Sequence, residues 1–343
     1  MKQITLKEIA ASLNVSVTTV SKALKGYKDV NEETKKLIIQ KAKELNYKPN
    51  IFAVNLRTKE SKTIGIIIPE VVHHFFSSVI KGVIAQAEKK GYLVIILQSN
   101  ESKELEKKQV ELLINKRVDG ILVSLANETN SYEHFYEILQ NEIPLVMFDK
   151  IAKLVKCNKV IINDQKAAYN ATKHLIDVGC KKIAHFRGPH LPQNSIDRFL
   201  GYKKAIDDHY LTYNSKLVYL LEKMTFKEGE YFARKLINEH PDVDGIFVNT
   251  DLVAVGAIKA INDLDFNVPN DIAVIGFSNW FMSAVISPSL STINQPGFEM
   301  GKQAFKLLFK EIKLKKKGEE IKPKTIELGT DLIIRESTQK SVS

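Results

Sequence analysis

The sequence has little cysteine and no long apolar run. Its two cysteines, Cys157 and Cys180, lie 23 residues apart, without a CxxC spacing or histidines at the spacing of metal ligands. We therefore expect a reduced pair and no metal site. No eighteen consecutive residues are apolar, and the chain starts with a capped-helix pattern rather than a charged segment and an apolar one. We expect a cytoplasmic chain that neither crosses a membrane nor is secreted.

Recognisable catalytic motifs are also missing. The sequence contains no nucleophile elbow, no P-loop and no HExxH pair, and its eight histidines are scattered. We expect no catalytic residues, no cofactor and no enzymatic activity. At 343 residues the chain is long enough for more than one domain and a sizeable core.

The amino-terminal segment carries two helix patterns separated by a short turn. Thr5 and Glu8 form a capping box before an apolar run at helical spacing, which stops at Asn14. Ser16 caps a second helix, which Gly26 ends. Two short helices joined in this way predict a helix-turn-helix, whose second helix lies in the major groove of DNA.

A third helix is predicted over residues 31–45. Its apolar side chains are expected to face inward and to complete a three-helix core. They are Leu37, Ile38, Ala42 and Leu45.

The second helix carries side chains suited to DNA. Val17 can press on a thymine methyl, Thr18 can donate or accept at a base edge, and Lys22 suits guanine O6 and N7. Short hydroxyls suit phosphates, which position the protein without specifying sequence. These candidates are Ser16, Thr19 and Ser21, with Thr5 counted among the DNA-binding residues.

A short segment after the third helix looks like a latent hinge. Asn50 can cap a helix of about eight residues, which is too short to hold its structure alone in water. We expect it to fold only against a partner copy and DNA. Leu56, beside Asn55, suits an apolar wedge in a minor-groove step, although an ordinary linker with one stray leucine is the simpler alternative.

Positive charge is concentrated at the same end. The chain carries 50 Lys and Arg against 40 Asp and Glu, and residues 1–62 hold 13 of the basic and 6 of the acidic residues. Such a basic region is expected of a phosphate-binding surface, with steep salt dependence.

The segment 4–69, "ITLKEIAASLNVSVTTVSKALKGYKDVNEETKKLIIQKAKELNYKPNIFAVNLRTKESKTIGIIIP", resembles the amino-terminal region of the LacI/GalR family of bacterial transcription regulators. The resemblance continues in the family's order through nearly the whole chain. The later motifs are "VDGILVS", "IPLVMFDK", "DRFLGYKKAI", "NTDLVAVGAIKAI", "DIAVIGFSN" and "LSTINQPGFEMG".

The resemblance implies a homodimer on a pseudo-palindromic double-stranded DNA operator. Val17, Thr18 and Lys22 would read bases, and Leu56 would be the wedge at the operator centre. Lys22 is a departure, because many members carry Arg there. Lysine is a point charge and not a bidentate fork, so guanine recognition at this position is expected to be looser or differently placed.

From residue 63 onward, short apolar strands alternate with helices, which predicts two doubly wound α/β lobes. The expected fold class is therefore α/β, with a three-helix helix-turn-helix domain and hinge helix followed by a two-lobed, periplasmic-binding-protein-like core. We expect the DNA-binding domain at 1–58, with the hinge at about 50–58, and the effector-binding and dimerisation domain at 62–338. The resemblance implies a chain crossover, which gives a first lobe of about 62–160 plus 293–322 and a second of about 161–290 plus 323–338.

Ligands of open α/β sheets bind beyond the carboxyl ends of the strands. Aromatic, carboxylate, amide and Arg side chains at those ends suit a sugar, because rings stack on its apolar faces and bidentate groups hold its hydroxyls. Arg198 has the strongest claim, since the family places a ligand-binding Arg in an R-x-x-G segment matched by residues 198–201. The effector-binding candidates are Phe75, Phe76, Asp149, Asp164, Asn194, Arg198, Asp251, Ser278 and Trp280.

Several of these candidates have a purely structural alternative. Asp149, Asp164 and Asp251 are placed where Asp commonly caps a helix or turn, and Phe75 and Phe76 equally suit a core. Ser278 stands where many members have a ligand-gripping Asp, so the effector is expected to be less polyol-like or differently held.

Three functions remain open on the sequence. The favoured one is a DNA-binding regulator, a repressor by preference, controlled by a small molecule, a carbohydrate by preference, between the lobes. A second keeps DNA binding but replaces the small molecule by a protein co-regulator. A third is a sugar-binding protein or enzyme on the same core without a DNA role.

Overall fold

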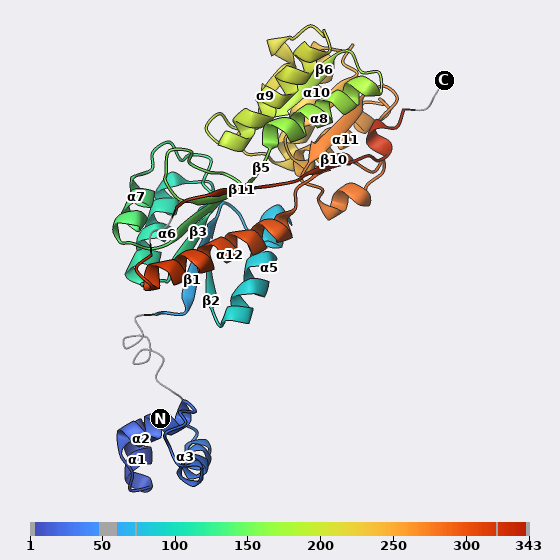
Figure 1. Cartoon of the computed structure of the whole chain (residues 1–343). Helices are drawn as coiled ribbons and strands as arrows, with labels where there is room; N and C mark the ends of the chain where they lie inside the picture. The colour runs from blue at the N-terminus through green and yellow to red at the C-terminus, as the bar shows by residue number, and fades with distance from the viewer. Residues whose placement is uncertain (1–3, 48–59, 73, 320–321, 341–343) are drawn as a thin grey trace. The chain divides into compact units, whose positions relative to one another are not determined.

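The computed structural model describes residues 4–47, 60–72, 74–319 and 322–340. The chain divides into two compact units, Met1–Glu60 and Ser61–Ser343. The first unit is helical and the second contains two lobes, each built on a six-stranded sheet (Figure 1). The predicted fold class, an α/β chain with a helical amino-terminal domain and a two-lobed core, is confirmed.

The first unit packs three helices around a small core. The helices are α1 (Leu6–Ser12), α2 (Val17–Leu24) and α3 (Glu32–Glu44). Ile9, Val20 and Ile38 are fully buried where the helices meet. Leu37 was expected to face this core and is instead 57% exposed. Consecutive helical residues point about 100° apart, so the face that buries Ile38 turns Leu37 outward.

The ends of these helices follow the local sequence. Thr5 and Glu8 form the capping box of α1, and the Ser16 side chain accepts a hydrogen bond from the Thr19 amide at the start of α2. Asn14 and Gly26, where the two helices stop, have φ angles of 50° and 76°. The left-handed backbone at these turns is tolerated by Asn and Gly, as the sequence predicted.

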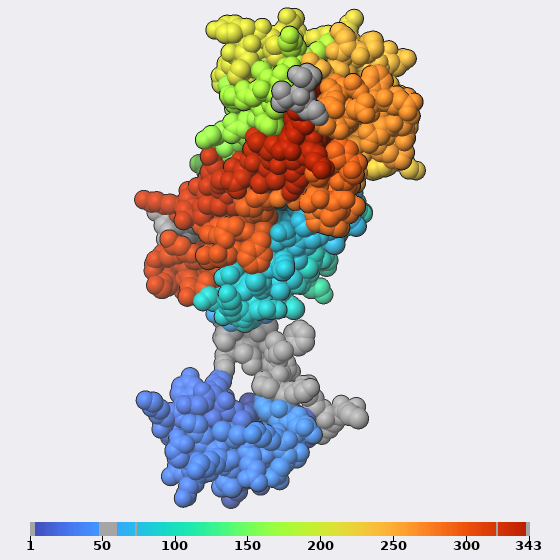
Figure 2. All heavy atoms as spheres, turned by 90° about the vertical axis from the view of Figure 1, so that its right-hand side faces the viewer, coloured from blue at the N-terminus to red at the C-terminus, as the bar shows by residue number. Residues whose placement is uncertain are grey.

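The sheet of the first lobe is entirely parallel, in the order β11-β5-β4-β3-β1-β2. Helices α5 and α12 pack together over one face and α6 and α7 over the other (Figure 1). Figure 2 shows the α12 residues, in orange, beside the α5 residues, in cyan. Neighbouring residues of β1 serve opposite faces, because Ile66 joins one core and Ile67 the other. The strands are β1 (Thr63–Ile68), β2 (Leu93–Gln98), β3 (Gly120–Val123), β4 (Leu145–Phe148), β5 (Asn158–Ile162) and β11 (Thr325–Leu328), and the helices are α5 (His74–Ala87), α6 (Lys103–Asn115), α7 (Glu133–Gln140) and α12 (Gly297–Lys316), with the 3-10 turn η1 (Glu88–Lys90) before β2.

The second lobe repeats this plan with the order β12-β10-β9-β8-β6-β7, but its last strand, β12, runs antiparallel to β10. Helices α8 and α9 pack as one pair and α10 and α11 as another. The strands are β6 (Ile183–Arg187), β7 (Val218–Leu220), β8 (Gly245–Val248), β9 (Ala273–Phe277), β10 (Ser291–Asn294) and β12 (Asp331–Ile333), and the helices are α8 (Asp164–Asp177), α9 (Gln193–Asp208), α10 (Phe226–Glu239) and α11 (Asp251–Asp263), with 3-10 turns η2 (Ser215–Leu217), η3 (Phe281–Ala284) and η4 (Glu336–Thr338).

The chain crosses between the lobes three times, and the expected strand assignments are corrected at each crossing. Strand β5 was expected to open the second lobe, yet it pairs with β4 in the first sheet. Strand β10, expected largely in the first lobe, pairs with β9 in the second. Strand β11 was expected in the second lobe and pairs with β5 in the first. An apolar run predicts a strand but carries no information about which distant strand it joins.

Candidate functional site

The outward face of α2 presents the predicted base-reading side chains. Val17 is 40% exposed although it is apolar, and Thr18 is also exposed. The opposite face of the helix holds Val20 and Ala23 in the core. This division of one short helix leaves its first turn available for a base edge or a thymine methyl.

Three of the predicted DNA-binding hydroxyls already take part in hydrogen bonds at helix starts. The Thr5 hydroxyl accepts from the Glu8 amide at 3.3 Å, and the Ser16 hydroxyl accepts from the Thr19 amide at 3.0 Å. The Ser16 and Thr19 hydroxyls also share a hydrogen bond of 2.8 Å. Ser21 is half-buried on the same helix. The remaining DNA-binding predictions lie outside the described residues; they are Asn50, Asn55 and Leu56.

Lys22 has a partner within its own unit. Its ammonium group donates a hydrogen bond to the Asp29 carboxylate, which raises the pKa of Lys22 and lowers the pKa of Asp29. Both side chains are exposed to solvent. A contact of Lys22 with a base, as the sequence predicts, would therefore require its ammonium group to leave Asp29.

A polar cluster joins the two lobes beyond the carboxyl ends of their strands. We call this set the inter-lobe cluster; it comprises Asp149, Asp164, Arg198, Asn249 and Gln295. At its centre Arg198 is 4% exposed and donates through Nε to Asp164 Oδ1 at 2.8 Å and through Nη1 to the Asn249 carbonyl at 2.9 Å. The guanidinium lies 3.6 Å from the centre of the Phe277 ring.

A glycine lets the two helices that carry Arg198 and Asp164 approach each other. A Cβ atom on Gly201 of α9 would lie 2.2 Å from the Gln165 carbonyl oxygen of α8. Such a contact is far too short for any side chain, so only glycine fits. The Arg198–Asp164 bond thus depends on the last residue of the R-x-x-G segment.

Asp149 brings the first lobe into the cluster. It is buried at the end of β4 with a φ of 57°, and Gln295 Nε2 lies 3.5 Å from its Oδ1. Burial raises the pKa of Asp149, while the positive charges of Arg198 and Lys150 oppose that rise. Burial likewise raises the pKa of Asp164 to about 7 against the attraction of Arg198. One guanidinium therefore faces two buried carboxyl groups, one from each lobe.

Several buried polar atoms beside this cluster have no hydrogen-bond partner among the residues that the structure describes. They are Arg187 Nε, Ser195 Oγ, Asn249 Oδ1 and Thr250 Oγ1. Gly188 lies against two of these side chains, because a Cβ atom there would be 2.7 Å from Asn249 Nδ2 and 2.9 Å from Ser195 Oγ. Buried polar atoms normally find a partner, so this group indicates a place for a polar ligand.

The other effector-binding predictions have different surroundings. Asp251 accepts hydrogen bonds from the Trp280 amide, Ser283 Oγ and Thr292 Oγ1, all in its own lobe. Phe75 and Phe76 are buried in a hydrophobic core, which favours the packing alternative. Asn194 and Ser278 are half-buried and take no part in the hydrogen bonds to Asp251. Ser278 has a φ of 112°.

Trp280 belongs to an aromatic contact between the lobes. It is half-buried, and its ring centre lies 5.6 Å from that of Phe281. Phe281 in turn lies 6.3 Å from the ring centre of His74, at the start of α5 in the first lobe. Pairs at such distances are favourable, so this contact helps to hold the lobes together.

Arg187, Asn249 and Thr250 stand at strand ends, where ligand-binding side chains were expected, but Gln295 and Ser195 were not expected from the sequence. Gln295 lies within the "LSTINQPGFEMG" motif and Ser195 follows the candidate Asn194. Position beyond a strand end could have signalled Gln295, which follows β10 directly. Ser195 gave no signal, because serine is common at helix starts.

A cavity of about 450 Å³ lies elsewhere in the first lobe. Its lining includes Pro144, Asn158 and Pro323, which stand where strands β4, β5 and β11 begin. The inter-lobe cluster lies at the strands' opposite, carboxyl ends. This cavity is therefore separate from the predicted effector site.

The part of the chain that the structure describes contains no grouped metal ligands and no helix suited to a membrane. Within residues 4–47, 60–72, 74–319 and 322–340, no three His, Cys, Asp or Glu side chains are grouped as metal ligands. In the same residues no helix combines the length and the apolar character needed to span a bilayer.

Comparisons with known proteins cover nearly the whole chain. Residues 5–50 match the family described as "Bacterial regulatory proteins, lacI family", and residues 172–338 match the family described as "Periplasmic binding protein-like domain". A ribose operon repressor from Halalkalibacterium halodurans is 32% identical over 337 residues, which cover 98% of this chain and 97% of that protein.

Solved structures extend the likeness to three dimensions. A complex of the transcriptional regulator CelR with cellobiose has a TM-score of 0.74 at 25% identity and covers 98% of this chain and 100% of that one. The lac repressor dimer bound to operator and the anti-inducer ONPF has a TM-score of 0.86 at 23% identity, covering 98% and 99%, which is a likeness of fold.

Proposed function

Since this chain belongs to the LacI family of bacterial regulatory proteins, we propose that it represses transcription as a homodimer on an inverted-repeat operator, under control of a small carbohydrate bound between its lobes. Regulation through DNA binding follows from the family. The observation that carries the effector proposal is Arg198, buried between two carboxyl groups from different lobes beside partnerless polar atoms.

The chemistry of the inter-lobe cluster suits a neutral, hydroxyl-rich ligand. Asn249 Oδ1 can accept a hydrogen bond, Arg187 Nε can donate one, and the Ser195 and Thr250 hydroxyls can do either. A sugar offers hydroxyls that donate and accept at once. A phosphate group buried beside Asp149 and Asp164 would be repelled by their negative charges. The ribose and cellobiose named in two similar proteins agree with this class.

Ligand binding would couple to lobe closure, because the cluster spans both lobes. Asp149 belongs to the first lobe and Arg198 to the second. A ligand that bonds to both favours one arrangement of the lobes over others, and the three crossovers confine the motion. This is the differential interaction that allosteric control requires. The predicted hinge at about 50–58, outside the described residues, would be the element that responds.

Exposed apolar side chains support a dimer through both lobes. Strand β2 is an edge of the first sheet, and Leu93 on it is 65% exposed, with Ile96 and Leu112 also exposed. Phe281 and Val285 are exposed on the second lobe. Unpaired edges and apolar patches of this kind are usually covered by a partner.

A DNA-binding regulator works beside the chromosome, so the proposal places this bacterial chain in the cytoplasm. It assigns no catalytic role to any residue and needs no cofactor. The inter-lobe cluster then serves as a sensor, and α2 as the reader of DNA sequence.

The experiment that tests this function selects genomic fragments with the purified full chain. We expect enriched inverted repeats and their release by one member of a sugar panel. Lys22→Ala should flatten the base preference, whereas Lys28→Ala, an exposed lysine outside α2, should preserve it. Enrichment of no inverted repeat would contradict the operator proposal, and release by no sugar would contradict the effector proposal.

A further inference from the structure

One edge of the first-lobe sheet is basic. All six strands are parallel, so their amino ends share one edge. Registers fix this alignment: Thr63 lies beside Leu93, Ile121 beside Leu145, and Lys159 beside Thr325. The segments that lead into the strands therefore gather there, with the carboxyl end of α12. We call this set the basic edge; its described residues are 60–62, 88–92, 115–119, 141–144, 156–157, 313–319 and 322–324.

The charge of the basic edge is far from that of the molecule around it. Counted on the sequence, its described segments hold twelve Lys or Arg and five Asp or Glu. Residues 1–59 hold twelve and five, and everything else holds 26 and 30. The net charges are thus +7 for the basic edge, +7 for residues 1–59 and −4 for the remainder. Almost all positive excess outside the DNA-binding unit lies at this one edge.

The basic edge also holds exposed cations that have no carboxylate partner. On the second lobe some exposed cations are paired, as Lys173 is with Asp177 and Lys204 with Asp208, and others are not, so the basic edge is distinguished by its excess of positive charge. At the basic edge, Lys116, Arg117, Lys322 and Lys324 are exposed and pair with no carboxylate among the residues the structure describes. Concentrated unpaired charge creates a strong local potential that attracts a polyanion.

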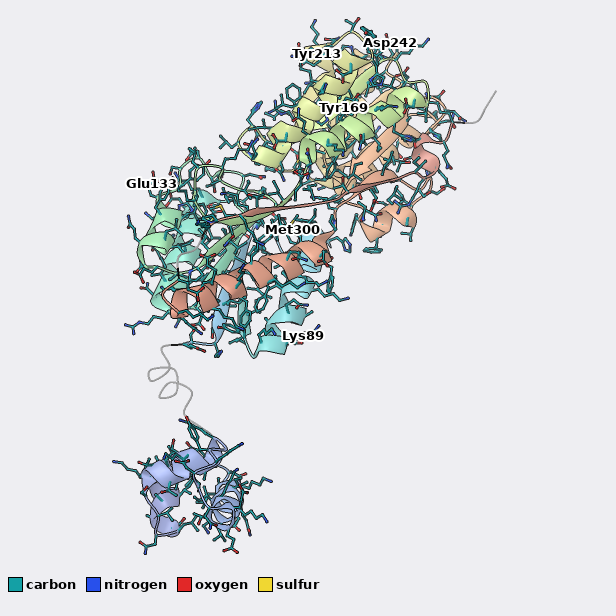
Figure 3. All side chains as sticks on the ribbon, viewed as in Figure 1. Lys89, Glu133, Tyr169, Tyr213, Asp242 and Met300 are labelled. Carbon is teal, nitrogen blue, oxygen red and sulfur yellow. The ribbon has the colours of Figure 1, made fainter. Side chains whose placement is uncertain are left out.

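The chain enters the second unit at this same edge. The amides of Ser61 and Lys62 donate to the two oxygens of Asp119, at 2.7 and 3.1 Å. The Lys62 carbonyl accepts from the Leu93 amide at 2.8 Å. Figure 3 shows Lys89 at the end of the first lobe where the chain enters. The entry point is thus fixed among the amino ends of β1, β2 and β3.

We propose that the basic edge binds the phosphate backbone of the DNA that the amino-terminal unit holds. Twelve residues, 48–59, connect Tyr47 to Glu60, and an extended chain of that length spans at most about 45 Å. The two ends of this connector can therefore lie no farther apart than that length. The contact is to phosphates and carries no base preference. This inference goes beyond the regulator function, which assigns DNA contact to α2 and the hinge.

The test measures how affinity for a random-sequence duplex of about 40 base pairs depends on salt. One variant of the full chain replaces Lys116, Arg117, Lys322 and Lys324 by Gln. A control variant replaces four exposed second-lobe lysines, Lys181, Lys216, Lys223 and Lys227, by Gln, which removes the same charge. Thermal unfolding of both variants checks that each is folded.

Each lost phosphate contact lowers the slope of log affinity against log salt by about 0.9 in magnitude. We expect the basic-edge variant to lose about 2 to 4 and the control less than about 0.5. Equal slopes of log affinity against log salt in the two variants would overturn the proposal. That result is also the one expected if the basic edge binds an acidic protein and not DNA. Wild-type protein that binds no DNA at all would refute the regulator function itself, so the two failures are distinguishable.

Discussion

Two aspartates that follow parallel strands, one in each lobe, differ in how their charge is satisfied. Asp149 follows β4 and Asp251 follows β8, and the two are 7% and 1% exposed. Asp251 receives hydrogen bonds from Trp280, Ser283 and Thr292 at 2.6 to 2.8 Å. Among the described residues Asp149 has one hydrogen-bond donor, Gln295, at 3.5 Å.

We interpret this contrast as one between a structural acid, Asp251, and an acid proposed to bind the ligand, Asp149. A buried carboxylate that accepts three hydrogen bonds within its own lobe has little capacity left for a ligand and holds local structure. An unsaturated one, opposite a guanidinium of the other lobe, retains capacity for a ligand. Four predictions test this division and the site around it.

Asp251→Ala should cause the largest effect, on stability. Three donors lose their acceptor, and we expect the free energy of unfolding to fall by about 3 to 5 kcal/mol. Trp280 is the sole tryptophan of the chain and donates its amide to Asp251, so its fluorescence reports unfolding of this lobe directly. A fall in the free energy of unfolding of less than about 1 kcal/mol would contradict a structural role for Asp251.

Arg198→Ala should abolish the effector response while leaving operator affinity without effector unchanged. The guanidinium bonds to both Asp164 and Asn249 and faces Asp149, so we expect effector affinity to fall about 100-fold. Operator release by the sugar found in the panel is the measurement. Arg198→Lys keeps the charge without the planar fork and should restore little. A response that survives the Ala variant would place the effector elsewhere.

Asp149→Asn should weaken effector binding by about 10-fold, because a charged acceptor becomes a neutral one. Stability should change by less than about 1 kcal/mol, or rise, since a buried charge with little support is removed. Asp251→Asn is the matched control, which should lower stability and spare the effector. The reverse pattern would exchange the roles of the two aspartates.

The smallest expected effect is a pH dependence due to Asp164. Its pKa is raised from 3.8 to about 7 by burial, so the folded chain holds the proton more tightly than the unfolded chain. The resulting stability is complete below about pH 4 and is lost as pH rises through 7. Between pH 6 and pH 8 we expect a fall of about 1.4 kcal/mol in wild type that Asp164→Asn lacks. The measurement is denaturant unfolding of wild type and of Asp164→Asn at both pH values. The same change in the free energy of unfolding in both proteins would contradict the raised pKa of Asp164.

The local parts of the molecule were predictable from the sequence, because short-range signals specify them. The caps at Thr5 and Ser16 and the turns at Asn14 and Gly26 stand where the residue types indicated. The family resemblance is confirmed by the relatives. Leu37 was misplaced because helical phase can slip by one residue within an apolar run.

Long-range features were not predictable in the same way. The lobe membership of β5 and β11 depends on pairing between strands far apart in sequence, which an apolar run does not encode. Asp149 and Asp251 look equivalent on the sequence, since their hydrogen-bond donors come from distant segments. Arg198 was identifiable through its R-x-x-G segment, whose glycine sets the close approach of α8 and α9.

The last strands have a consequence for how the protein is made. β11 completes the first sheet and β12 the second, and only the two residues 329 and 330 separate them. A ribosome must therefore deliver nearly the entire polypeptide before either lobe can close its sheet, whereas the three amino-terminal helices are complete early. A nascent or prematurely terminated chain would therefore contain the amino-terminal helical unit without two complete lobes. We expect translation errors late in the gene to yield a protein that keeps the DNA-binding unit and lacks the effector response.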